Sequence, residues 1–239
     1  MNTKMKVLSL ALLGLCGYAG SAMADCPSGP TVAEGGAWTA APTFQGTLGI
    51  VTPGYSGTEC HLESKISAGA GGAAFAYVQD DSPAAESRYR AHFIVNVDAL
   101  SNQALLATAN VFSAVSANGV AVYFSVYGNG SGGHRIGYFV TDSSQASGLS
   151  VGSAELASGE NHVEFDLKVG SPGSFTMWVN SNTEASPTIP TVQVTNANQQ
   201  IETAYLGLSA PSPQFVSAHA GTAVGFDQFD SRRQTFIGY

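Results

Sequence analysis

The stretch that decides the fold is H-V-E-F-D-L-K-V (162–169), followed by G-S-P-G-S (170–174) and F-T-M-W-V-N (175–180). Apolar residues take every second position in the first and third of these segments. Polar residues fill the positions between them in the first. Because alternate side chains of a strand point to opposite faces, each of these two segments predicts a β-strand with one dry face.

The two predicted strands form a hairpin if both apolar faces are kept on the same side. That condition is met when Val169 faces Phe175, which leaves a five-residue loop, Gly170 to Ser174. The same pairing puts Trp178 opposite Asp166 on the polar face. A tryptophan on a wet face is a candidate for binding a ligand.

Alternating or apolar runs continue along most of the chain, and turn residues separate them. The runs that we predict as strands lie at 38–51, 58–66, 75–78, 88–97, 105–113, 120–127, 134–140, 188–194 and 200–209. Residues 105–113 also allow a helical turn, and 210–221 read as a Pro/Ser/Gly loop. About a dozen short strands predict an all-β sandwich, jelly roll or barrel.

The first 24 residues have the features of a signal peptide. Lys4 and Lys6 precede an apolar run over 7–15, and Ala22-Met23-Ala24 is a small-x-small cleavage site. We therefore expect removal of residues 1–24 and export to the periplasm or the cell exterior.

Residues 25–239 are long enough for one folded unit with a sizeable core. We expect 25–57 to be an irregular segment packed on the sandwich, and 58–239 to form the sandwich itself. The whole sequence has 9 basic and 17 acidic residues, a net charge of −8. Without a basic cluster, a nucleic-acid partner is not expected. After the leader, no apolar run approaches the ~20 residues of a membrane-spanning helix.

Cys26 and Cys60 are the two cysteines outside the leader. In an oxidising compartment they are expected to form a disulfide that holds the N-terminal segment. A redox role would need a closer spacing.

A second predicted hairpin carries rings on its outer face. Pairing Phe124 with Ile136 buries the aliphatic sides of both strands and places Gly137 opposite Tyr123. If this hairpin and the first one lie in the same sheet, their polar faces join into one platform for a glycan, because sugars stack on rings and bond to polar groups. The candidate ligand-binding residues are Tyr123, Tyr127, Arg135, Asp166 and Trp178. The alternative is that loops or the N-terminal segment cover these rings.

Three segments together resemble a known group of proteins. They are A-Y-V-Q-D-D-S-P-A-A-E-S-R-Y-R-A-H-F (76–93), F-T-M-W-V-N (175–180) and G-F-D-Q-F-D-S-R-R-Q-T-F-I-G (225–238). The chain resembles exported bacterial proteins with a concanavalin A-like (laminin-G-like) jelly-roll domain. The resemblance implies that fold for 58–239. The wider fold includes lectins, carbohydrate-binding modules, lyases and glucanases, so it does not decide the activity.

Many domains of this fold bind structural calcium, so the resemblance adds weight to the acidic residues. The hard oxygen ligands are Asp80, Asp81, Glu86, Asp227 and Asp230, of which Asp80 and Asp227 are our candidates for Ca²⁺. Alternatively, Asp227 pairs with Arg88 or Arg90. We expect Asp230 to form salt bridges with Arg232 and Arg233. No other cofactor is predicted.

The glucanases of this fold carry three carboxylates on one strand, in the pattern E-x-D-x-x-E or E-x-D-x-E. Glu164 and Asp166 begin that pattern, but no third carboxylate follows. H-E-x-x-H does not occur, and no nucleophile accompanied by a base is recognisable, so we assign no catalytic residue. The leading hypothesis is a non-catalytic, lectin-like glycan-binding protein. The alternatives are a structural or adhesive protein that binds another protein, and a glycan hydrolase or lyase that uses Glu164 and Asp166.

Overall fold

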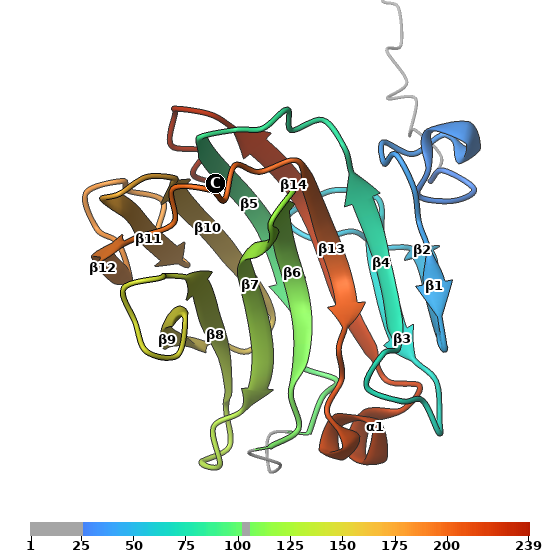
Figure 1. Cartoon of the computed structure of the whole chain (residues 1–239). Helices are drawn as coiled ribbons and strands as arrows, with labels where there is room; N and C mark the ends of the chain where they lie inside the picture. The colour runs from blue at the N-terminus through green and yellow to red at the C-terminus, as the bar shows by residue number, and fades with distance from the viewer. Residues whose placement is uncertain (1–25, 102–105) are drawn as a thin grey trace, which may run out of the picture.

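Two antiparallel sheets of seven strands are stacked face to face in the computed structural model, which describes residues 26–101 and 106–239 (Figure 1). The front sheet has the order β1 (Thr43–Phe44), β4 (Phe75–Asp80), β13 (Thr203–Ser209), β6 (Ala109–Ser116), β7 (Gly119–Gly128), β8 (His134–Thr141) and β9 (Leu149–Leu156). The back sheet has the order β12 (Ile189–Val194), β11 (Gly173–Val179), β10 (Glu160–Lys168), β5 (Arg88–Asn96), β14 (Ala223–Arg232), β3 (His61–Ile66) and β2 (Gly46–Val51). The predicted jelly-roll sandwich is confirmed, whereas the predicted signal peptide lies outside the described residues.

Aromatic rings from both sheets meet at the centre of the sandwich. Phe165 of β10 is fully buried and lies 5.3 Å from Phe112 of β6 and 5.1 Å from Phe124 of β7, measured between ring centroids. Phe93 of β5 stacks on Phe112 at 5.4 Å. Edge-to-face and offset contacts of this kind stabilise a core beyond the area that they bury. The apolar faces read from the sequence are therefore the inner faces of the two sheets.

The hairpin of β10 and β11 forms, but its predicted register is wrong by two residues. Leu167, not Val169, lies opposite Phe175. Lys168 is paired with Ser174, and the N–H and the carbonyl of Gly170 both bond to Asn196, each at 2.9 Å, so the loop of the hairpin begins at Val169. A shift of two residues keeps every side chain on its predicted face.

The hairpin of β7 and β8 shows the same offset. Phe124 lies opposite Tyr138 instead of Ile136, and Gly137 lies opposite Ser125 instead of Tyr123. Here too the buried face is the predicted one.

The predicted loop at 210–221 contains a short helix, α1 (Pro213–His219). Its signal was present in the sequence: Ser212 caps the helix by accepting from the N–H of Phe215, and Pro213 occupies the first turn. Within the described ranges, no helix is long and apolar enough to cross a membrane.

Candidate functional site

The structure divides the five predicted ligand-binding residues between the outer faces of the two sheets. Tyr123, Tyr127 and Arg135 belong to β7 and β8 of the front sheet, whereas Asp166 and Trp178 belong to β10 and β11 of the back sheet. The single platform assumed from the sequence does not form, because its two hairpins are in different sheets.

The outer face of the front sheet carries a row of side chains that runs across the strands. In register, the row is Gln79, Tyr205, Ser113, Tyr123, Phe139 and Val151. The rings of Tyr123 and Phe139 stack in parallel planes at 4.5 Å. The rings of this row are half-buried, so their outer parts face solvent.

More rings extend this row toward β1. Tyr77 lies 4.7 Å from Tyr205, Phe75 lies 4.9 Å from Tyr77, and Phe44 lies 6.1 Å from Phe75. Phe44 is 51% exposed. These four rings, with Tyr205 among them, were not predicted as ligand-binding residues, although Phe75, Tyr77 and Tyr205 alternate with buried residues and were therefore recognisable as outward-facing.

Tyr127 and Arg135 lie opposite each other at the far side of the front sheet. A Cβ added at Gly137 would come within 3.3 Å of the Tyr127 and Phe139 rings, so these two rings lean over the glycine. Arg135 pairs with Glu155 at 3.4 Å, which balances the charge here.

The outer face of the back sheet holds a cluster of charged side chains. Arg88 donates two hydrogen bonds to the Asp166 carboxylate, of 2.9 and 2.8 Å, and Arg90 donates a third of 3.3 Å. Burial works against the charge of Asp166, but the bond from Arg88 and the charge of Arg90 hold its pKa below the usual value. The alternative that Asp227 pairs with Arg88 or Arg90 is wrong, because Asp166 takes both.

Trp178 is buried, and the prediction of a wet tryptophan is therefore wrong. Its ring is 3% exposed and lies opposite Glu164, not Asp166. Its indole N–H donates to the carbonyl of Glu184, and Phe236 packs edge-on against it at 5.3 Å.

Phe236 belongs to residues 233–239, which we call the strap. The N–H groups of Ile237 and Gly238 each donate a 2.9 Å bond to one oxygen of the Glu164 carboxylate. Burial raises the pKa of Glu164, although these two bonds act in the opposite direction. Tyr239 stacks on His162 at 3.8 Å. The strap thus covers the strand positions that the sequence placed on a wet face.

Two histidines beneath the strap form a hydrogen-bonded pair. His92 Nε2 lies 3.1 Å from His162 Nδ1, and His92 Nδ1 lies 3.1 Å from the carbonyl of Gln228. Since a carbonyl only accepts, His92 carries its proton on Nδ1, and its Nε2 accepts from His162. Burial lowers the pKa of His92 to about 4, so it is neutral at pH 7.

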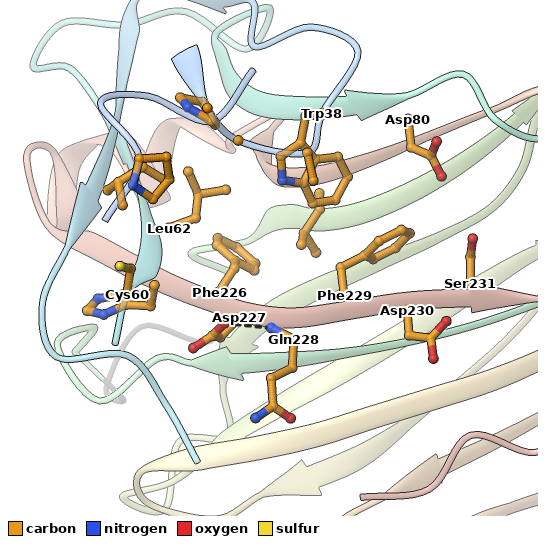
Figure 2. A pocket seen from close by; sticks show the side chains of 18 of the residues that line it. Trp38, Cys60, Leu62, Asp80, Phe226, Asp227, Gln228, Phe229, Asp230 and Ser231 are labelled. Atoms are coloured by element: carbon orange, nitrogen blue, oxygen red, sulfur yellow. Dashed lines mark hydrogen bonds between the residues drawn. The ribbon is translucent and has the colours of Figure 1, made fainter. Parts of the chain in front are cut away.

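A pocket of about 760 Å³ opens where the N-terminal segment covers one end of the sandwich. Figure 2 shows Trp38, Phe226 and Phe229 around it, with Asp80 and Ser231 toward one end. Trp38 and Phe229 are in contact at 4.9 Å. The Asp227 side chain points away from the pocket, on the other side of β14 (Figure 2).

Both acidic residues predicted to bind calcium belong to the wall of this pocket, Asp227 with its carboxylate turned away from it, and protein donors engage both carboxylates. Asp80 accepts from the N–H and the hydroxyl of Ser82. Asp227 accepts from the Tyr55 N–H and the Thr58 hydroxyl, which fixes the loop before β3. No group of three or more potential metal ligands occurs in the part of the chain that the structure describes. Calcium binding stays a prediction.

The salt bridges predicted for the end of β14 are only partly as expected. Arg232 pairs with Asp230 at 2.8 Å, as predicted. Arg233 instead pairs with Glu86 at 2.7 Å, where the strap begins.

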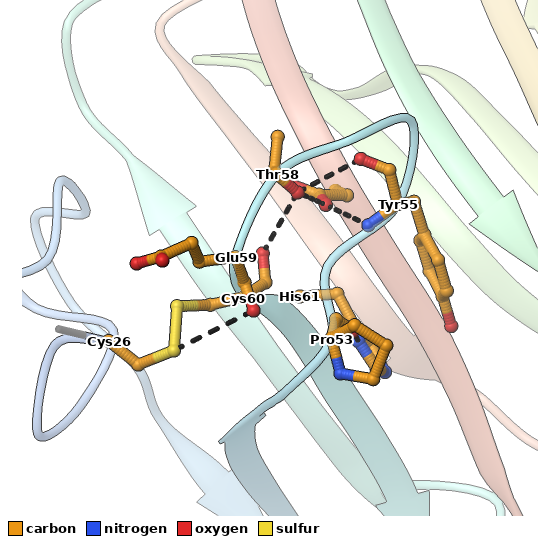
Figure 3. The surroundings of a disulfide bond; sticks show 8 residues. Cys26, Pro53, Tyr55, Thr58, Glu59, Cys60 and His61 are labelled. Atoms are coloured by element: carbon orange, nitrogen blue, oxygen red, sulfur yellow. Dashed lines mark hydrogen bonds between the residues drawn. A yellow bond between two sulfur atoms is a disulfide. The ribbon is translucent and has the colours of Figure 1, made fainter. Parts of the chain in front are cut away.

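The predicted disulfide between Cys26 and Cys60 is present (Figure 3). It joins the start of the N-terminal segment to the residue before β3, across a sequence separation of 34. Cys60 also lines the pocket, so the bond holds the segment that carries Trp38 against the sandwich.

Comparisons with known proteins are consistent with this architecture. No known family and no curated protein matches the sequence. Among solved structures, the chain is similar to an endo-beta-1,4-glucuronan lyase from the fungus Trichoderma reesei, with a TM-score of 0.61, 15% identity, and coverage of 82% of this chain and 91% of that one. It is also similar to the cellulose induced protein Cip1 (TM-score 0.54, 15% identity, 86% and 97%) and to the alginate lyase Aly36B (0.52, 13%, 72% and 80%). At identities of 13–15% the similarity shows the fold alone.

Replacing both cysteines with serine should lower the free energy of unfolding by about 3–4 kcal/mol, because the disulfide limits the entropy of the unfolded chain. Urea unfolding of residues 25–239 measures this change. Wild-type protein in a reducing agent should behave like the double variant. An unchanged unfolding midpoint would contradict the prediction.

Acid should destabilise the protein through His92. Its pKa of about 4 lies below that of an unfolded histidine, so the unfolded state binds more protons between about pH 6.5 and 4. The free energy of unfolding therefore falls as the pH falls through this window, by up to about 3 kcal/mol from His92. Glu164 acts in the opposite direction because its pKa is raised.

Urea unfolding at pH 7 and pH 4.5 tests this, with His92→Gln as the comparison, because glutamine can still donate to Gln228 and does not titrate. The variant should lose less stability than the wild type on acidification. Equal losses in the two proteins would rule out the assignment.

Proposed function

We propose that this protein binds a neutral polysaccharide on the outer face of its front sheet and catalyses no reaction there. The observation that carries the proposal is the pair of tyrosines, Tyr205 and Tyr123, on either side of Ser113 in one row across the sheet. Tyr205 is in contact with Tyr77 on one side, and Tyr123 is stacked on Phe139. The side of each ring that faces Ser113 has only that small side chain as its neighbour in the row.

The spacing suits a sugar ring. β13 and β7 both pair with β6, so the two tyrosines are about two strand spacings, ~10 Å, apart. Two aromatic contacts to one intervening ring take up about 8 Å at ordinary van der Waals distances. Hydroxyls of the same sugar would meet Ser113 and the amide of Asn110, which lies further along β6.

A chain of sugars, rather than a single residue, fits the length of the row. From Phe44 to Phe139 the rings cross six strands of the front sheet, and Tyr127 adds a further ring beside Phe139. Arg135 and Glu155 neutralise each other, so the surface favours a neutral ligand over a charged one. Asp166 and Trp178 are not part of this proposal, because both are buried on the other face.

The comparisons support a polysaccharide ligand. Two of the similar structures are named as lyases of glucuronan and alginate, and a third as a cellulose induced protein. The disulfide fits an exported protein, and we propose that binding takes place in the periplasm or outside the cell.

A lyase or hydrolase that uses Glu164 and Asp166 is the second candidate. Their opposite pKa shifts favour it, because an acid and a base need different environments. However, two arginines engage Asp166, and the strap engages Glu164. This candidate therefore needs the strap to move before a substrate can enter.

The Tyr123→Ala variant should bind a soluble neutral polysaccharide about tenfold more weakly, equivalent to about 1.4 kcal/mol, because it loses a stacking ring. Affinity electrophoresis through gels containing β-glucan, xylan or mannan measures the loss. Tyr205→Ala should act in the same way, and Tyr123→Phe should keep most of the affinity.

Val151→Ala is the matched control, because Val151 is 57% exposed at the end of the same row and offers no ring. If wild type and Tyr123→Ala were retarded equally, this site would be excluded. Sugar release that disappears in Glu164→Gln would favour the enzyme. Retention of a protein partner in the absence of any polysaccharide binding would favour the adhesive alternative.

A further inference from the structure

The strap covers the back sheet mainly with main-chain donors and rings. Its two N–H groups satisfy the Glu164 carboxylate, one on each oxygen. Tyr239 lies flat on His162, and Phe236 contacts Trp178. Arg233 anchors its start through Glu86. Two adjacent donors on a carboxylate, with flat groups on either side, are features that a small polar ligand could reproduce.

Arg90 shows that the strap does not satisfy the groups beneath it. The residue is 2% exposed, yet its Nε and Nη1 have no hydrogen-bond partner. Only Nη2 is engaged, by Asp166 at 3.3 Å and Glu184 at 2.6 Å. A buried donor without an acceptor is costly, and for a charged group the cost is larger. The strap offers Arg90 the ring of Phe236 at 5.8 Å.

We infer that the strap occupies a second carbohydrate site, whose ligand is a sugar with two adjacent hydroxyls. Two neighbouring hydroxyls can donate to the two oxygens of Glu164 in place of the N–H groups of Ile237 and Gly238. Oxygen atoms of the same sugar can accept from the free N–H groups of Arg90. Trp178 and His162 then supply ring faces in place of their contacts with Phe236 and Tyr239.

The charges in the cluster favour a neutral ligand. Arg88 and Arg90 pair with the carboxylates of Asp166 and Glu184, and Arg233 of the strap is already paired with Glu86. Glu164 adds a third carboxylate, which has no arginine as a hydrogen-bond partner among the described residues. His92 is neutral at pH 7. An anionic sugar would bring further negative charge close to Glu164. A hydroxyl-rich neutral sugar satisfies both the donors and the acceptors without that repulsion.

The strap and the sugar compete for the same atoms, which gives the site a measurable signature. A ligand that binds only the open form has an apparent affinity reduced by the fraction of open molecules. Weakening the strap without touching the site should therefore tighten binding. This second site is on the face opposite the aromatic row, so it does not depend on the proposed function.

The experiment uses the full chain carrying Tyr123→Ala, which weakens the front-sheet site, and three neutral probes: cellotetraose, xylotetraose and mannotetraose. In this background, adding Phe236→Ala and Tyr239→Ala should tighten binding of at least one probe about tenfold in calorimetry. Gln234→Ala is the control, because Gln234 is an exposed strap residue outside the contacts described above.

Two further measurements locate the effect. Glu164→Gln in the strap-weakened protein should lower the gain, because the amide replaces one of the two acceptor oxygens with a donor. The bound probe should also speed hydrogen exchange of the Ile237 and Gly238 amides in the protein with an intact strap.

Tighter binding that depends on Glu164, with faster exchange, would support the inference. It would be overturned by equal affinity with intact and weakened straps, by full affinity in Glu164→Gln, or by failure of all three probes to bind the strap-weakened protein. A failure of the front-sheet site, seen as binding that does not depend on Tyr123, would overturn the proposed function and would not bear on the strap.

Discussion

The contact of Phe165 with Phe112 and Phe124 across the sandwich is the constraint on which the rest depends. It fixes the direction in which β10 faces, because side chains alternate along a strand. With Phe165 inside, Glu164 and Asp166 must lie on the outer face, next to the arginines of β5. The charged cluster is thus a direct consequence of the core packing.

The charged side chains that the core packing directs to the outer face of the back sheet are nevertheless buried. A buried charge is costly unless it is paired and hydrogen-bonded. Arg88 and Arg90 meet this requirement for Asp166, and the main chain of the strap meets it for Glu164. The two outer faces therefore differ in kind: rings lie open on the front sheet, whereas ion pairs lie under a covering segment on the back sheet.

Much of the fold could be predicted from alternation alone. Alternation predicted correctly which side chains of β7, β8, β10 and β11 point into the core. The Cys26–Cys60 bond followed separately from the number of cysteines. The pairing registers were not obtainable in this way, because a shift of two residues leaves the pattern unchanged. Only a contact between distant segments, such as Gly170 with Asn196, decides between them.

The candidate site could be predicted only in part. Tyr123, Tyr127 and Arg135 lie together as expected, but the sequence carries no information on which sheet a hairpin joins. For the same reason it could not show that Trp178 would be covered by a segment nearly sixty residues further along the chain. Tyr205 was recognisable as outward-facing, but its place beside Ser113 depends on the pairing of β13 with β6.

The contact between Glu164 and the strap is made to the backbone, and this has an evolutionary consequence. A carboxylate that accepts from main-chain N–H groups does not discriminate among the side chains that those residues carry. Position 238 is nevertheless restricted, because its φ of +67° is a backbone conformation that favours glycine. Substitutions at position 237 can therefore accumulate with little selection against them from this contact.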